Sequence, residues 1–198
     1  MHEQTGGLIA LDRTTLTLHP DALLRTLGCP DAAQTEDLRQ AAEDAIACAA
    51  AAADPRVLWR RFPLAWGEDT LSLAGSTLTL PGKDITAHLA GCRDCILFAV
   101  TLGLGIERAL AGLSADPIAA MYFDTACSLL VEEAADAAER LMPAHDTWRY
   151  SPGYGDLPLE IQGRLLAVID APRQLGLTLT DSGMMLPRKS ITAIVGCA

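Results

Sequence analysis

The organisation of the chain is clearest in residues 149–196, RYSPGYGDLPLEIQGRLLAVIDAPRQLGLTLTDSGMMLPRKSITAIVG, where a glycine-containing loop leads into a helical pattern and then into extended runs. Asp156 is a residue type that caps helices, and Pro158 is tolerated in a first helical turn. The apolar positions at helical spacing, which predict the inner face of that helix, are Leu157, Ile161, Leu165 and Val168. Strands are expected at Leu177–Thr180 and Ser190–Gly196.

Upstream of this segment, helical and extended patterns alternate without a regular βαβ rhythm. The long pattern over Asp116–Met142 predicts one helix, half of it in the core. RVLWRRFPLAW (56–66) predicts a strand, DTLSLAGSTLTLPG (69–82) a hairpin and CILFAVTLG (95–103) a buried strand. LTLHPDALLRTLGCP (16–30) suggests a strand followed by a short helix. This mixture indicates an α+β fold.

Composition and charge disfavour several classes of function. The chain has 198 residues, half of them hydrophobic, which suits one domain or two small ones. Its 15 basic and 25 acidic residues give a net charge of −10, which disfavours a nucleic-acid partner because phosphate binding needs concentrated Lys and Arg. Residues 1–14 show no secretory signal, and the longest nearly uncharged run, AIACAAAAA (45–53), is too short to span a bilayer. We therefore expect a cytoplasmic protein that binds neither nucleic acid nor membrane.

The six cysteines do not form the dense framework of a small secreted scaffold. Cys92 and Cys95 form a C-x-x-C pair, a spacing used by thiol-redox pairs and by one half of a zinc site. A zinc site needs two further ligands, and the sequence has no second C-x-x-C and no H-x-x-x-H. The pair directly precedes an apolar run. We therefore interpret most of the cysteines as small buried hydrophobic residues and predict no metal site.

The four histidines do not complete a catalytic or cobalamin-ligating motif. His88 and Gly91 match the end of the pattern D-x-H-x-x-G, but Asp84 lies four residues before the histidine instead of two. We therefore do not expect cobalamin ligation by this chain's own histidine. The sequence also shows no nucleophile–base pair, so no catalytic residue is predicted.

The loop at 149–155 combines residue types that suit a small zwitterion with an aromatic group. Arg149 offers a planar fork of donors for a carboxylate. Gly153 and Gly155 allow close approach of a ligand or a positive φ, and Tyr154 can stack on a flat ring or hydrogen-bond through its hydroxyl. The alternative interpretation is a tight turn with a surface arginine.

Two carboxylates on the predicted long helix are further candidates for the site. Asp124 lies in the apolar half of this helix, where a carboxylate needs a partner or a function. Glu132 lies two turns further along, close to the same face. Either side chain can meet a ligand ammonium or a hydroxyl pair. The alternative for Asp124 is a hydrogen bond to a neighbouring helix end.

Several motifs together resemble the activation domain of cobalamin-dependent methionine synthase, and more closely the short stand-alone proteins of that family. They are R-x-x-P-G-Y at 149–154, L-G-L-x-L-T at 175–180, S-x-M-M-x-P-x-K-S at 182–190, LFAVTLG at 97–103 and FDTACSLLVEE at 123–133. The resemblance implies one domain over residues 1–198, with helices and a hairpin in 1–80 and the best-matching part, including the ligand loop, in 81–198. It also implies a twisted antiparallel sheet flanked by helices.

By the same resemblance, the domain binds S-adenosylmethionine, and Arg149 holds the methionine carboxylate. The residues that would line the pocket are Tyr150, Ser151, Pro152, Gly153 and Tyr154. A further acidic residue would pair with the ligand's ammonium, for which Asp124 and Glu132 are the candidates.

The resemblance implies a repair function on a separate corrinoid protein, for which a split methionine synthase is the leading candidate. Cobalamin that has oxidised to cob(II) is reduced by an external donor, flavodoxin or ferredoxin in the family, and S-adenosylmethionine then restores methylcobalamin. The chain would be an accessory component of that methyltransferase. The alternative is a non-catalytic docking module that caps the corrin of a partner without binding S-adenosylmethionine. A third hypothesis is a thiol-redox or metal protein that uses Cys92 and Cys95.

Overall fold

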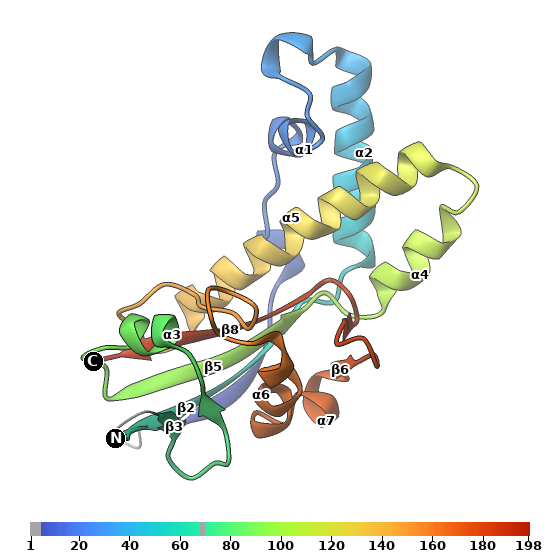
Figure 1. Ribbon diagram of the computed structural model, residues 1–198. Coiled ribbons are helices and arrows are strands. Elements are labelled where there is room, and N and C mark those ends of the chain that lie inside the picture. Colours follow the sequence, from blue (N-terminus) through green and yellow to red (C-terminus); the bar gives the residue numbers. More distant parts are fainter. Residues whose placement is uncertain (1–4, 68–69) are drawn as a thin grey trace.

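The computed structural model describes residues 5–67 and 70–198 and has a six-stranded sheet at its centre (Figure 1). The strand order is β4-β3-β2-β5-β8, β1 also pairs with β2, and these pairs are all antiparallel. The strands are β1 (Gly6–Ala10), β2 (Arg56–Trp66), β3 (Leu71–Leu73), β4 (Thr79–Leu80), β5 (Asp94–Thr101) and β8 (Ser190–Cys197). A separate two-stranded hairpin consists of β6 (Thr178–Leu179) and β7 (Met185–Leu186).

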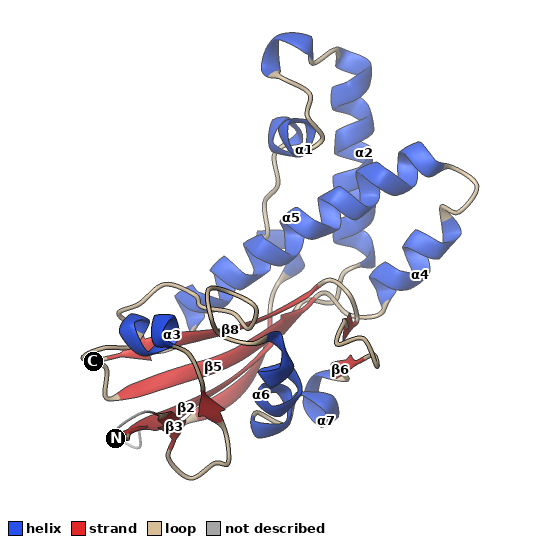
Figure 2. Ribbon diagram, viewed as in Figure 1, coloured by secondary structure: helices blue, strands red, loops and turns tan. Residues whose placement is uncertain are grey.

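Both faces of the central strand β5 are buried, which explains its continuous apolar run. Alternate side chains of the central strands point to opposite faces: Trp59 and Phe98 pack in one core, whereas Leu58 and Leu97 pack in the other. The first face carries α1 (Pro20–Thr26), α2 (Glu36–Ala52), α4 (Gly105–Gly112) and α5 (Pro117–Leu141). The second carries α3 (Lys83–His88), α6 (Gln162–Val168) and α7 (Ala171–Leu175) (Figure 2).

The long helices of the first face are capped and closely packed. Asp116 accepts a hydrogen bond from the backbone N–H of Ala119 at 3.0 Å, and Pro117 occupies the first helical position of α5. Buried alanines on both α2 and α5, such as Ala49 and Ala134, allow the two helices to approach closely. In Figure 1, α1 and the outer part of α2 extend beyond the sheet.

The α+β fold class with an antiparallel sheet flanked by helices is confirmed. The predicted strand at 56–66 coincides with β2, and the predicted hairpin contains β3 and β4. The strand expected at the start of 16–30 was wrong, because those residues form a non-strand connection that leads into α1, and the N-terminal strand is β1 instead. Within the described residues, no helix is both long and apolar enough to cross a bilayer.

Candidate functional site

The site lies along the outer edge of β8, the last strand of the sheet. One half of this edge is covered by the segment that follows α5. Tyr150 and Ile194 exchange two backbone hydrogen bonds, at 2.9 and 2.8 Å, and the N–H of Asp146 donates to the carbonyl of Gly196 at 2.8 Å. These contacts satisfy the exposed backbone groups of an edge strand over 194–196.

The other half of the β8 edge opens into a cleft of about 610 Å³. The cleft is bounded by α5, the 149–154 loop, the start of α6 and the segment between β6 and β8. Because alternate residues of a strand face the same edge, the backbone N–H and C=O of Thr192 point the same way as those of Ile194, here into the cleft. The lining residues used below are Glu132, Trp148, Arg149, Ser151, Tyr154, Leu159, Gln162, Met184, Arg188 and Thr192.

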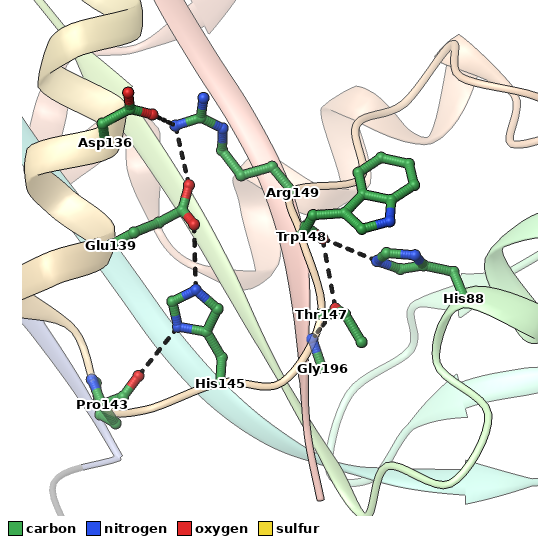
Figure 3. A network of polar contacts seen from close by, with 9 residues as sticks. All are labelled: His88, Asp136, Glu139, Pro143, His145, Thr147, Trp148, Arg149 and Gly196. Carbon is green, nitrogen blue, oxygen red and sulfur yellow. Dashed lines mark hydrogen bonds and ion pairs between the residues drawn. The ribbon is translucent and has the colours of Figure 1, made fainter.

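Arg149 points from the loop toward α5, where three carboxylates surround its guanidinium. Figure 3 shows two of them, Asp136 and Glu139. Arg149 Nη1 lies 2.7 Å from Asp136 Oδ1 and 2.9 Å from Glu139 Oε1, and its Nη2 lies 3.3 Å from Glu132 Oε2. Glu139 also contacts His145, whose Nε2 lies 3.1 Å from the second carboxylate oxygen. Asp136 and Glu139 were not among the predicted residues, although the acidic run on the helix was visible in the sequence.

The glycines of the loop have the conformation that their side-chain-free backbone permits. Gly153 has φ 91° and Gly155 has φ 50°. Tyr150 is buried against the second core, and its hydroxyl donates to the carbonyl of Tyr154 at 3.2 Å. Burial, with the nearby carboxylates of Asp84 and Asp156, raises the pKa of Tyr150 above its ordinary value. Tyr154 leaves half of its surface exposed at the mouth of the cleft.

The predicted role of Asp156 as the cap of the following helix was wrong. Its carboxylate accepts hydrogen bonds from the backbone N–H groups of Lys83 at 2.6 Å and Asp84 at 3.1 Å, at the start of α3. The helix after the loop begins with a 3-10 turn, Leu159–Ile161, behind Pro158, which provides no side-chain cap. Asp156 therefore caps α3, which is distant in the sequence, instead of the helix that directly follows it.

Five of the eight predicted site residues line the cleft: Glu132, Arg149, Ser151, Pro152 and Tyr154. Tyr150 lies behind the loop, and Gly153 shapes its turn without lining the cleft. Asp124 is not brought to the cleft. Its carboxylate lies 2.9 Å from Lys189 Nζ, so it has a structural partner on the segment that enters β8.

Ten of the residues that line the cleft were not predicted, among them Gln162, Arg188 and Trp148. Gln162 is buried, and its Nε2 donates to Thr192 Oγ1 at 2.6 Å across the end of the cleft. Arg188 is paired through Nε with Glu107 at 3.0 Å, and Trp148 is exposed beside the loop. A polar Gln inside an apolar helical stripe was the one available signal. Arg188 occupies an unspecified position of the S-x-M-M-x-P-x-K-S motif, so the sequence did not single it out.

The buried cysteines are part of the core. Cys92, Cys95, Cys127 and Cys197 are buried, whereas Cys48 is exposed. Burial raises the pKa of both thiols of the C-x-x-C pair, which opposes formation of a reactive thiolate. Within the described residues, no group of three His, Cys, Asp or Glu is arranged to hold a metal ion.

Comparison with solved structures identifies a protein domain of similar fold. It matches the crystal structure of the MetH reactivation domain bound to AdoHcy with a TM-score of 0.77 at 15% sequence identity, covering 98% of this chain and 79% of that chain. The chain therefore has the fold of the methionine synthase reactivation domain, which confirms the resemblance found in the sequence. No protein-family model and no curated protein matches the sequence.

Proposed function

We propose that the β8 cleft binds S-adenosylmethionine and that the chain is a cytoplasmic accessory that supports reductive methylation of cobalamin on a separate corrinoid protein, a split methionine synthase in particular. The observation that supports this most directly is the position of the 149–154 loop. It forms one wall of a cleft in a fold whose solved counterpart was crystallised with AdoHcy, a close analogue of S-adenosylmethionine.

The charges at the cleft wall suit the amino-acid end of this ligand. The contact of Arg149 with Glu132 is the longest of its three ion pairs, and Glu132 is well exposed. A zwitterion can enter this pair, with its carboxylate on the guanidinium and its ammonium on Glu132, so that each charge keeps a partner. The main-chain groups of Thr192 provide a further donor and acceptor. This arrangement gives roles to both Arg149 and Glu132.

The remaining tasks of the protein are to position the ligand and to exclude water. S-adenosylmethionine supplies a methyl group carried on a sulfonium cation. The exposed ring of Tyr154 offers a face for that cation.

 Four exposed apolar side chains lie around the mouth of the cleft: Trp148, Tyr154, Leu159 and Met184. Together they offer a surface for the corrinoid partner.

A calorimetric titration of the full chain with S-adenosylmethionine tests the proposal. We expect micromolar binding, and we expect Arg149→Ala to weaken it by about 100-fold because a charge-assisted pair is lost. Arg173→Ala is the matched control, since Arg173 is an exposed, ion-paired arginine on α7 outside the cleft. Equal affinity of the unaltered chain and Arg149→Ala would contradict the proposal.

The repair activity needs a second experiment. An anaerobic mixture of the chain, a candidate corrinoid protein and a flavodoxin or ferredoxin reductant is followed by absorbance for conversion of cob(II)alamin to methylcobalamin. We expect conversion only when the chain and S-adenosylmethionine are both present. Conversion at the same rate without the chain would remove the accessory role.

A docking module without ligand binding is the second candidate, and one observation favours it. Both terminal nitrogens of Arg149 already contact carboxylates of the protein, so a ligand has to compete for them. This candidate predicts no heat and no thermal shift at millimolar S-adenosylmethionine, together with retained binding to the corrinoid partner.

A further inference from the structure

Two carboxylates that are far apart in the sequence hold each other's backbone beside the cleft. Asp156 accepts hydrogen bonds from the N–H groups of Lys83 and Asp84, and Asp84 Oδ2 accepts one from the N–H of Asp156 at 3.3 Å. The contact joins the end of the ligand loop to the start of α3. It is reciprocal, so each aspartate both supports the other's backbone and is supported by it.

The glycines around this contact show how closely the two segments approach. Gly82 precedes α3 and has no side chain with which to cap it, so Asp156 from the loop takes that role. A Cβ at Gly82 would collide with the Asp156 carboxylate, and a Cβ at Gly155 would collide with Asp84 and with the Tyr150 hydroxyl. Both glycines also have positive φ. The close approach therefore depends on glycine on both sides.

The reciprocal contact of Asp84 and Asp156 fixes the part of the loop that lines the cleft. At its start, the loop is held on β8 by the backbone pairing of Tyr150 with Ile194. At its end, Asp156 holds it on α3. Between these points the N–H of Gly153 donates to the carbonyl of Leu157 at 2.9 Å, and the N–H of Leu157 donates to the carbonyl of Tyr154 at 3.0 Å. The half-exposed ring of Tyr154 also lies edge-on to the ring of Tyr150, with the two ring centroids 6.0 Å apart.

We propose that Asp156 and Asp84 are positioning residues, which hold the 150–156 loop on α3 so that the Tyr154 wall of the cleft is formed before the ligand binds. This inference rests on the proposed function of the cleft. Neither aspartate needs to touch the ligand. Their effect is to remove the cost of ordering the loop during binding, which is the usual gain from a preformed site.

The test compares two aspartates that cap helices at different distances from the cleft. Asp116 caps α5 and lies 16 residues before Glu132, which corresponds to about 24 Å along a helix. Asp116→Ala therefore removes a helix cap and leaves the loop intact. Asp156→Ala removes a helix cap and, with it, the contact that holds the loop on α3. Asp156→Asn is a second variant of nearly the same size, in case the alanine variant does not fold.

Two quantities are measured for each full-length variant: affinity for S-adenosylmethionine by calorimetry, and amide hydrogen exchange of Gly153 and Leu157 by NMR without ligand. For Asp156→Ala we expect about tenfold weaker binding and about tenfold faster exchange at both amides, with a smaller change in Asp156→Asn. The double variant Asp84→Ala/Asp156→Ala should bind no more weakly than Asp156→Ala, because the two residues act as one unit. Asp116→Ala should change neither quantity.

Unchanged loop exchange and unchanged affinity in Asp156→Ala would overturn the inference, as would equal changes in Asp116→Ala. If the unaltered chain binds no S-adenosylmethionine, the proposed function fails. The exchange measurement contains no ligand, so it still decides separately whether Asp156 holds the loop.

Discussion

The two halves of the β8 edge differ in what covers them, although they belong to one strand. Over 194–196, the edge is covered by protein, through the backbone pairing of Tyr150 and the contact of Asp146. Over 190–192, the same edge faces the cleft. The chain leaves the edge after Tyr150, so the candidate site begins where protein pairing stops. An edge strand that is covered only in part retains backbone donors and acceptors for a ligand.

The largest effect is expected in the covered half. Ile194 is fully buried in the second core, so Ile194→Ala should lower the free energy of unfolding by about 3 kcal/mol, measured by chemical denaturation. Its affinity for S-adenosylmethionine, measured well below the unfolding midpoint, should stay within about twofold of the unaltered chain. Ile191→Ala in the open half is the control, and there we expect a smaller loss of stability. A larger loss of unfolding free energy in Ile191→Ala than in Ile194→Ala would show that the covered half does not contribute more to stability than the open half.

Thr192 in the open half should give an intermediate effect. Thr192→Val leaves the buried amide of Gln162 without its hydroxyl acceptor, and we expect a loss of about 1–2 kcal/mol in unfolding free energy. Adding Gln162→Leu removes the other polar partner, so the double variant should recover most of the loss. Denaturation curves of the single and double variants measure this. No loss in Thr192→Val would mean that this hydrogen bond does not stabilise the cleft.

A smaller effect is expected for the residue at the boundary of the two halves. Tyr150→Phe keeps the ring in its buried position and removes only the hydroxyl that donates to the Tyr154 carbonyl. We expect about 1 kcal/mol lower stability and a few-fold weaker ligand binding, measured by denaturation and calorimetry. An unchanged affinity would mean that the Tyr150 hydroxyl does not help to order the loop for ligand binding.

The smallest effect concerns pH and the end of the covered half. Burial raises the pKa of the Cys197 thiol above its ordinary value of 9.0. The unfolded chain therefore releases this proton first, so the stability linked to the thiol is present below about pH 9 and is lost as pH rises toward the folded-state pKa. Cys197→Ala should lose less stability between pH 8 and pH 10 than the unaltered chain. Chemical denaturation at pH 8 and pH 10 measures both losses. A loss of stability between these pH values that is equal in Cys197→Ala and in the unaltered chain would contradict this prediction.

The sequence predicted those elements whose signal is local. The strand at 56–66 and the long helix at 116–142 were recognised because apolar periodicity reports directly on burial. β1 was missed, since a short glycine-containing segment shows little alternation before its partner strand is known. Asp156 was assigned to the wrong helix because the cap it provides is a tertiary contact with α3.

The site was predictable to the same extent. The loop motif identified Arg149, Ser151, Pro152 and Tyr154 by residue type and resemblance, and these residues do line one cleft. The sequence could not show that Arg149 faces Asp136 and Glu139, because that pairing depends on how the loop crosses α5. It also could not show that Gln162 reaches Thr192, since these residues come from different elements.

Hydrogen exchange of the β8 amides with and without S-adenosylmethionine tests the central claim most directly. The account predicts that saturating ligand slows exchange at Thr192 and in the loop at 151–157, while the amides of Ile194 and Gly196, already bonded to protein, change little. Protection that appears only outside the cleft, or no protection at millimolar ligand, would contradict the assignment of the open edge as the ligand site.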